Sequence, residues 1–364
     1  MQTAISKRSV ELKKIISAFE IEGEIDFLQE LSKGLINTTY LIKTNQRKYI
    51  LQKINITILK NVSGIINNIE IVNSHLKNNN YQYELLEMIK TKDNNNLFYD
   101  TLTAPWRCYK YIEHKNYTIE DLNDEIIFEF GKAIGHFHAC LSSLDSVNIL
   151  NTITDFHNTK NYFNSLKQVI NKTTTVKKEE VQLSLMFIQQ FNDKFQQINE
   201  LIQERKLPLR VCHNDTKIDN ILFEKNGKNI KSIIDLDTLM GNSIIYDFGD
   251  AIRTSCNTRK EHDTQINKVE FEFNLFKSFA KGYVGESKTF IYEAERDLLA
   301  FSPILVTLEQ AIRFFIDYLN EDSYYRINYS KQNLRRGLNQ IALAKKMLLK
   351  EKEMKNYINS LFQS

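Results

Sequence analysis

The stretch of sequence that decides the fold is His213–Asp237, which reads HNDTKIDNILFEKNGKNIKSIIDLD. The dipeptide Asn226-Gly227 near its centre is a strong signal for a two-residue turn between antiparallel strands. Pairing residues about this turn places Asn220 within a couple of residues of Asp235. One hairpin therefore brings together an amide, a carboxylate and the polar loop that precedes the first strand.

These residue types at this spacing suit phosphoryl transfer, which depends on positioning and charge neutralisation more than on covalent chemistry. Oxygen ligands from Asn220 and Asp235 suit Mg²⁺, a hard ion that prefers octahedral oxygen coordination. Asp215 would orient an acceptor hydroxyl and accept its proton, while Lys217 would offset the charge of the transferring phosphoryl group. Asp237 is either an outer partner of this site or an acid at a strand end.

The main alternative is a polar hairpin loop that carries no chemistry. For a single Asp or Lys, that interpretation would be favoured. However, the pattern H-x-D-x-K-x-x-N is followed about 15 residues later by an Asp that ends a hydrophobic strand. This order and distance match the catalytic loop and the metal-binding Asp of kinases. The spacing therefore favours a kinase-like site.

Length and composition bound the class of protein. With 364 residues and 42% hydrophobic residues, the chain has room for about two globular domains. The formal net charge of +3 comes from 48 basic and 45 acidic residues that are interspersed, which argues against a nucleic-acid partner. Four separated cysteines without zinc spacing indicate reduced thiols and a cytoplasmic location. We expect no signal peptide, no membrane span and no membrane partner. The sequence sets no oligomeric state.

The pattern of hydrophobic residues changes near residue 113. Before it lie short β-branched and aromatic segments, interrupted by one amphipathic helix at 62–77. After it lie long segments of helical periodicity, interrupted by a strand-like island at 209–238. We therefore predict an α+β protein with a small antiparallel β-rich N-terminal lobe, residues 1–113, and a larger mainly helical C-terminal lobe, residues 114–364.

The chain resembles the aminoglycoside phosphotransferase and choline kinase superfamily, most closely the bacterial N-acetylhexosamine 1-kinases. Besides the hairpin, the similar segments are Ile36–Tyr40, Tyr49–Gln52, Trp106-Arg107, Phe156-His157, Tyr246–Arg253 and Arg313–Leu319. The resemblance implies a two-lobed protein-kinase-like fold with ATP as co-substrate and Mg²⁺ as cofactor. It also implies phosphorylation of the anomeric hydroxyl of N-acetylglucosamine or N-acetylgalactosamine, and hence a role in carbohydrate metabolism.

The same resemblance assigns the nucleotide to the first lobe. Gly34 would let the backbone approach a phosphate, although a glycine that only forms an ordinary hairpin turn would give the same sequence pattern. Gln52 stands where kinases usually carry a Lys on the third strand, and Lys53 points to the opposite strand face. Backbone groups of Tyr111 and Ile112 resemble the hinge that hydrogen-bonds adenine. Without that role, the two side chains would simply belong to the hydrophobic core of a strand.

For the acceptor, the resemblance points to Arg313 and Tyr324 as sugar contacts, whereas helical spacing alone would give Arg313 only surface ion pairs. Leu35 stands where a histidine is expected near the sugar, which weakens the case for acetamide recognition. His213 is expected to brace the catalytic loop. Asp247 begins an Asp-Phe-Gly triplet but lies too far along the chain to be the metal ligand, so we expect it to accept hydrogen bonds from the loop backbone.

Two other functions remain open. The first is a kinase of the same fold that phosphorylates another hydroxyl, in an amino alcohol, homoserine or an aminoglycoside, and an antibiotic acceptor would call for an acidic cleft. The second is a non-catalytic nucleotide or sugar sensor, which the absent third-strand Lys and the sparse glycine loop suggest.

Overall fold

The computed structural model describes residues 11–31, 36–225 and 227–363, and the chain divides into two units. The first unit comprises residues up to Asn67 together with Glu84–Glu113, and the second comprises Asn68–Tyr83 together with the chain from His114 onward. A β-rich first unit and a larger, mainly helical second unit agree with the predicted fold class. The assignment of nucleotide binding to residues 1–113 and of catalysis to residues 114–364 stays a prediction.

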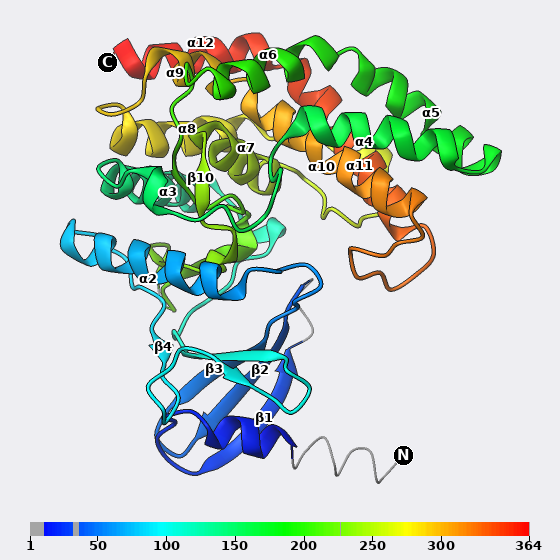
Figure 1. Ribbon diagram of the computed structural model, residues 1–364. Helices are drawn as coiled ribbons and strands as arrows, with labels where there is room; N and C mark the ends of the chain where they lie inside the picture. The colour runs from blue at the N-terminus through cyan, green and yellow to red at the C-terminus, as the bar shows by residue number, and fades with distance from the viewer. Residues whose placement is uncertain (1–10, 32–35, 226, 364) are drawn as a thin grey trace. The chain divides into compact units, whose positions relative to one another are not determined.

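An antiparallel sheet forms the centre of the first unit (Figure 1). Its strand order is β1-β2-β3-β6-β4, and β5 pairs with β6 outside this path. The strands are β1 (Ile25–Leu31), β2 (Thr38–Thr44), β3 (Lys48–Lys53), β4 (Met88–Ile89), β5 (Phe98–Tyr99) and β6 (Pro105–Lys110).

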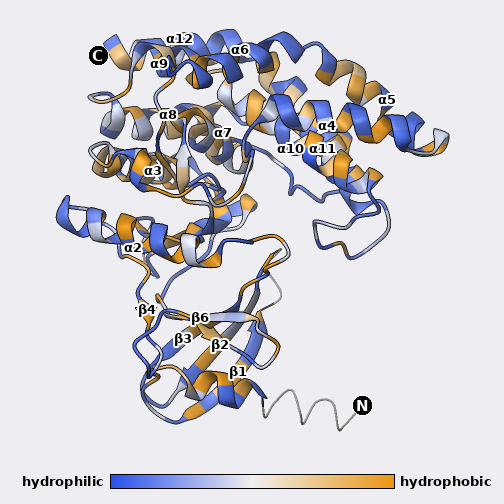
Figure 2. Cartoon of the chain, in the orientation of Figure 1, coloured by the Kyte–Doolittle hydropathy of each residue, from blue (hydrophilic) through white to orange (hydrophobic). Residues whose placement is uncertain are grey.

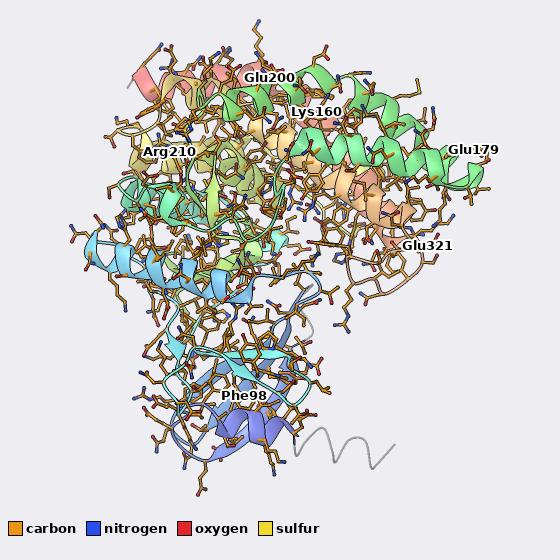
Figure 3. The ribbon with its side chains drawn as sticks, in the orientation of Figure 1. Phe98, Lys160, Glu179, Glu200, Arg210 and Glu321 are labelled. Carbon is orange, nitrogen blue, oxygen red and sulfur yellow. The ribbon has the colours of Figure 1, made fainter. Side chains whose placement is uncertain are left out.

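Alternation along these strands separates an apolar face from a polar one. On the apolar face, side chains of β2, β3 and β6 pack against the helical residues 11–17 and the residues that follow them. Phe98, labelled in Figure 3, closes this core edge-on against Phe19, with 6.4 Å between the ring centroids. On the opposite face, Gln52 of β3 lies directly across from Arg107 of β6. The sheet therefore places two polar side chains together.

Helices make up most of the second unit, and α2 (Val62–Asn78) crosses the boundary between the units. The other helices are α3 (Asp124–Leu141), α4 (Thr159–Lys172), α5 (Thr175–Gln189), α6 (Asn192–Gln203), α7 (Ile244–Ser255), α8 (Phe273–Ser287), α9 (Glu293–Leu299), α10 (Ser302–Leu319), α11 (Gln332–Leu348) and α12 (Glu351–Gln363). In Figure 2 the outer helices α5 and α12 carry both hydrophilic and hydrophobic residues, as expected of amphipathic helices with one buried face.

Glycines allow the closest helix contacts in this unit. A Cβ at Gly131 of α3 would lie 2.1 Å from the Phe279 carbonyl of α8, and one at Gly282 would lie 2.2 Å from the Phe128 carbonyl. A Cβ at Gly249 of α7 would lie 2.5 Å from the Ser302 carbonyl oxygen of α10. Larger residues would push these helices apart, so Gly131 and Gly282 set the spacing of α3 and α8, and Gly249 sets the position of α7 against α10.

The predicted hairpin forms as expected between β8 (Ile221–Phe223) and β9 (Ile230–Ile233), with Ile221 paired to Ile233. Beside it, β7 (Arg210–Cys212) pairs with β10 (Met240–Asn242). Arg210, labelled in Figure 3, ties β7 to α9, because its guanidinium donates to both Glu295 carboxylate oxygens at 2.7 and 2.9 Å. Short 3₁₀ turns follow β7 and β9, at Ile218–Asn220 and Leu236–Thr238.

In the described ranges, no single helix is both long and apolar enough to cross a membrane. The pair α9 and α10 passes that test only when taken together, and the two helices bend by 65° at their junction.

Candidate active site

The loop between β7 and β8 is held by Asp247, a buried residue in the first turn of α7. Its Oδ2 accepts the backbone N–H of His213 at 2.8 Å, and its Oδ1 accepts that of Asn214 at 2.6 Å. Burial alone would raise the pKa of Asp247, but the hydrogen bond and charge of His138 and the backbone donors hold it below its usual range. A buried carboxylate therefore fixes the start of the loop.

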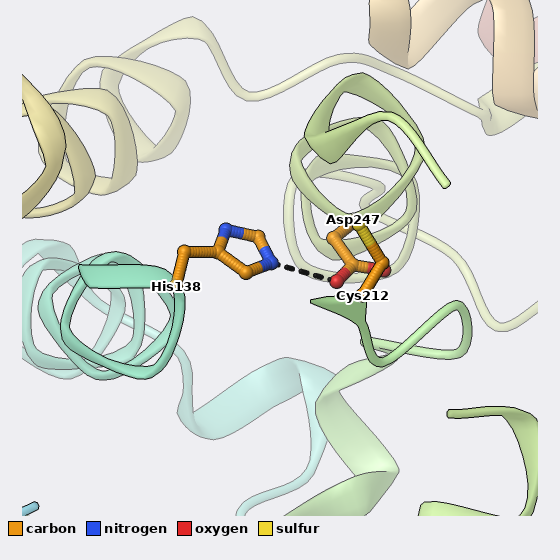
Figure 4. A group of neighbouring side chains, drawn as sticks. All are labelled: His138, Cys212 and Asp247. Atoms are coloured by element: carbon orange, nitrogen blue, oxygen red, sulfur yellow. Dashed lines mark hydrogen bonds and ion pairs between the residues drawn. The ribbon is translucent and has the colours of Figure 1, made fainter. Parts of the chain in front are cut away.

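His138, Cys212 and Asp247 lie close enough to suggest a metal site, with their ligand atoms within 4.8 Å of one another (Figure 4). The contacts favour a hydrogen-bond network instead. His138 Nε2 lies 2.8 Å from Asp247 Oδ2, and its Nδ1 lies 2.9 Å from the Tyr283 hydroxyl. The Cys212 thiol donates to the Asn242 carbonyl at 3.3 Å, and burial raises its pKa.

Asp215 projects from this loop beside two of the predicted site residues. Lys217 Nζ donates to Asp215 Oδ2 at 2.7 Å, and Asn220 Nδ2 donates to the same oxygen at 3.1 Å and to the Asp215 carbonyl at 2.8 Å. The Asp215 and Lys217 side chains are 28% and 27% exposed, so a ligand can reach them. The structure thus brings together three of the residues predicted from the sequence.

Charges around Asp215 keep it ionised. Burial alone would raise the pKa of Asp215, but the positive charge and hydrogen bond of Lys217 outweigh burial and hold the pKa below its usual range. Burial would lower the pKa of Lys217, but Asp215 and then Asp235 raise it. At neutral pH the pair is a carboxylate beside an ammonium group, and the carboxylate is able to accept a hydrogen bond from an acceptor hydroxyl.

His213 connects this loop to the hairpin. Its Nδ1 accepts the backbone N–H of Asp215 at 3.2 Å, so the ring proton lies on Nε2, which faces the Ile234 carbonyl at 2.9 Å. This contact agrees with the bracing expected of His213.

Asn220 and Asp235 are adjacent through the hairpin backbone, where the Ile234 N–H donates to the Asn220 carbonyl at 2.9 Å. Because the Asn220 amide N–H₂ faces Asp215, its Oδ1 is directed elsewhere. Asp235 has a left-handed backbone with φ of 63° and an exposed side chain. An amide oxygen and an accessible carboxylate suit a hard divalent cation such as Mg²⁺.

Within the described ranges, Arg313 forms none of the surface ion pairs that helical spacing suggested. Its guanidinium lies over the rings of Phe156, Tyr162 and Tyr325, at 5.2, 5.5 and 5.8 Å from their centroids. Its Nη1 donates to Gln310 Oε1 at 3.3 Å, a neutral partner. The acids one turn away on α10 bind other groups, so Arg313 is a cation in an aromatic setting.

Tyr324 lies beside this aromatic group. Its backbone N–H donates to Asp317 Oδ1 at 2.7 Å, and its ring meets that of Tyr325 edge-on at 4.7 Å. Its side chain remains partly exposed. The structure therefore places Arg313 and Tyr324, both predicted acceptor contacts, in one neighbourhood of the second unit.

In the first unit, Gln52 Oε1 accepts a hydrogen bond from Arg107 Nε at 3.0 Å, and Gln52 Nε2 donates to the Thr39 hydroxyl at 3.2 Å. Tyr111 donates its backbone N–H to the Lys48 carbonyl at 3.0 Å. Ile112 is buried. The glycine predicted to approach a phosphate, at position 34, and its neighbour at 35 lie outside the described residues.

Sequence reasoning missed two charged residues. Arg107 is only 2% exposed, and the hints of it were a charge inside an apolar strand and its place in the similar segment Trp106-Arg107. Asp250, one helical turn after Asp247, accepts from Arg253 Nε at 2.8 Å through Oδ1, while its buried Oδ2 has no hydrogen-bond partner among the described residues. Asp250 also helps to raise the pKa of Lys217. No pattern in the sequence separated Asp250 from an ordinary helix acid.

Comparison with known protein families gives one match that covers most of the chain. A family described as the phosphotransferase enzyme family, APH, matches residues 28–267. The matched region includes the loop between β7 and β8 and the hairpin that follows, and it ends before α8.

Solved structures share the fold at low sequence identity. Spectinomycin phosphotransferase APH(9)-Ia, in complex with ADP and spectinomycin, is 14% identical with a TM-score of 0.65, and the match covers 94% of this chain and 98% of that one. Amicoumacin kinase hAmiN, in complex with AMP-PNP and Ca²⁺, is 13% identical with a TM-score of 0.61, covering 98% and 96%. Plasmodium vivax ethanolamine kinase is 15% identical with a TM-score of 0.56, covering 88% and 83%. The predicted aminoglycoside phosphotransferase-type fold is confirmed.

Proposed function

Because the chain belongs to the phosphotransferase enzyme family, we propose that it uses ATP to phosphorylate the anomeric hydroxyl of an N-acetylhexosamine. The observation that carries the proposal is the ionised Asp215 on a braced loop, with Lys217 at 2.7 Å and the oxygen donors of the hairpin beside it. Similar folds solved with ADP or AMP-PNP support a nucleotide as co-substrate.

In this mechanism, Asp215 accepts the proton of the acceptor hydroxyl as the oxygen attacks the γ-phosphorus in line. Lys217, which pairs with Asp215, would turn toward the phosphoryl group and offset its charge. Asn220 and Asp235 would hold Mg²⁺, which neutralises phosphate charge when bound. Asp247 and His213 keep the Asp215 backbone in place throughout.

The surroundings of Arg313 support a neutral acceptor. A guanidinium among aromatic rings suits sugar hydroxyls and an acetamide oxygen, whereas a polycationic antibiotic needs free carboxylates. The nearby acids are engaged, since Glu309 pairs with His157 at 2.7 Å and Asp317 accepts the Tyr324 N–H. This distribution of charge favours a sugar over an aminoglycoside or an amino alcohol.

On the nucleotide side, we propose that Arg107 supplies the positive charge that a third-strand Lys supplies in other kinases. The two positions are cross-strand partners, and Arg107 Nε bonds Gln52 at 3.0 Å. The Arg107 guanidinium also lies over the Tyr109 ring, 5.1 Å from its centroid, and a guanidinium is a good donor to phosphate oxygens. The lack of a Lys on the third strand therefore does not favour a non-catalytic sensor over a kinase.

A panel of acceptors tests the proposal. Purified protein with ATP and Mg²⁺ is incubated separately with N-acetylglucosamine, N-acetylgalactosamine, other hexoses, ethanolamine, homoserine and kanamycin, and products are identified by ³¹P NMR. We expect an N-acetylhexosamine 1-phosphate. Product from a non-sugar acceptor alone would replace the sugar assignment. Quenching of the sole tryptophan, Trp106, by ATP without any product would favour the sensor.

A further inference from the structure

His157 is a buried histidine that the proposed mechanism does not use. It precedes α4 with a left-handed backbone, φ 58°, and its side chain is 5% exposed. Its Nδ1 lies 2.7 Å from Glu309 Oε1 of α10, and its Nε2 lies 3.0 Å from the Asn214 carbonyl. The ring therefore joins a long helix to the loop that carries Asp215.

The partners of the ring fix its protonation state. A carbonyl oxygen only accepts hydrogen bonds, and so does an ionised carboxylate, so both ring nitrogens of His157 must carry protons. Burial alone would raise the pKa of Glu309, but His157 holds it below its usual range, which keeps the carboxylate ionised. Burial would lower the pKa of His157, yet the charge and hydrogen bond of Glu309 raise it. The pair is an imidazolium and a carboxylate.

The peptide group that the ring reaches is the one between Asn214 and Asp215. Its carbonyl accepts from His157 and its N–H donates to His213 Nδ1 at 3.2 Å, so two histidines hold its opposite ends. Asn214 has φ of 64°, which is unusual for a residue with a side chain and needs support from its surroundings. The direction in which Asp215 leaves the loop depends on this peptide.

Other groups facing the ring leave this arrangement intact. The Tyr246 ring of α7 stacks on it at 4.7 Å and 22°. Arg313, one turn after Glu309 on α10, opposes the positive charge of His157 but does not outweigh Glu309. Thr159 donates its hydroxyl to the other oxygen of Glu309. The carboxylate is thus anchored from two sides.

We propose that His157 is a positioning residue: as an imidazolium paired with Glu309, it holds the Asn214 carbonyl and thereby aims Asp215 at the acceptor. This inference rests on the proposed phosphotransfer function for its catalytic consequence, but not for the state of the ring. Loss of the Nε2 proton would release the carbonyl, so turnover should fall as His157 deprotonates.

NMR of the full chain with ¹⁵N-labelled histidine tests the state of the ring without any substrate. The His157 signals are assigned from their loss in His157→Gln. We expect the His157 ring to keep both protons to a higher pH than a free imidazole does, and Glu309→Gln to lower the titration midpoint. A His157 titration midpoint at or below that of a free imidazole in the wild-type protein would overturn the proposal, whether or not the protein is active.

Kinetics test the consequence. We expect His157→Gln to lower kcat by about ten- to a hundredfold, because small displacements of a catalytic group are costly, with KM for ATP changed less than about twofold. Wild-type kcat should fall at the pH at which NMR shows His157 deprotonating, and Glu309→Gln should move both midpoints down together. The exposed His262→Gln should match the wild type. If kcat of Glu309→Gln falls at the same alkaline pH as kcat of the wild type, positioning by His157 is refuted, even if His157→Gln does not fold.

Discussion

Replacing Asp247 with Asn tests how far one buried carboxylate holds the second unit together. The side chain is fully buried and accepts three hydrogen bonds, from the backbone N–H groups of His213 and Asn214 and from the His138 ring. Asn has nearly the same shape but only one acceptor atom. In either orientation its N–H₂ group faces a backbone N–H that it cannot bond, that of Asn214 or that of His213.

The magnitude follows from the donors left without a partner. Each buried, unsatisfied polar group costs about 1–3 kcal/mol. The variant leaves two such groups, a backbone N–H and its own N–H₂ group. We therefore expect Asp247→Asn to lower the free energy of unfolding by about 3–5 kcal/mol. Native domains are stable by only about 5–15 kcal/mol, so the change is a large fraction of the total.

Urea unfolding followed by far-UV circular dichroism measures this loss, because the second unit contains most of the helices. Asp219→Asn is the matched control: the same chemical change in the same loop, at an exposed side chain, should stay within about 0.5 kcal/mol of wild type. A wild-type midpoint for Asp247→Asn would refute the bracing role of the carboxylate.

The same carboxylate predicts a direction for pH. Its folded-state pKa is lowered, so its contribution to stability is complete above the unfolded pKa of about 3.9 and is lost as pH falls through the folded value. The wild type should therefore lose more stability between neutral pH and pH 3 than Asp247→Asn does. Equal acid sensitivity of the two proteins would contradict this assignment.

Two further substitutions test the binding roles. Arg107→Gln should raise KM for ATP by about ten- to a hundredfold, since a charged hydrogen bond contributes about 1.5–3 kcal/mol. The exposed Lys110→Gln is the control and should leave KM for ATP unchanged, and equal KM values for the two variants in initial-rate assays would remove Arg107 from the nucleotide site. Arg313→Met should raise KM for the sugar by about the same factor and leave KM for ATP unchanged, whereas the control Arg335→Met should change neither. An unchanged KM for the sugar in Arg313→Met would remove Arg313 from the acceptor site.

Local features of the fold were predictable because local chemistry encodes them. The Asn-Gly turn set the pairing of Asn220 near Asp235, and the register of Ile221 with Ile233 agrees with it. The resemblance to kinases also placed Asp247 behind the loop, despite its misleading Asp-Phe-Gly triplet. These inferences depend on residues close in sequence or on a motif with fixed spacing.

The remainder depends on contacts between distant residues. Spacing along one helix offered surface ion pairs as the alternative role of Arg313, but Glu309, one turn before it, bonds His157, which is 152 residues away. Arg107 meets Gln52 only because β3 and β6 are neighbours, which no local pattern states. Burial then decides the chemistry, because it gives these charges partners that helical or strand periodicity cannot identify.

Turnover by Asp215→Asn tests the central claim most directly, that Asp215 is the base of a phosphotransferase. The kinetics of the variant are compared with those of Asp219→Asn, and ATP affinity is followed by Trp106 fluorescence. We predict that kcat falls by about 10²–10⁴-fold while ATP affinity stays within about twofold of wild type. Wild-type turnover in Asp215→Asn would contradict the account.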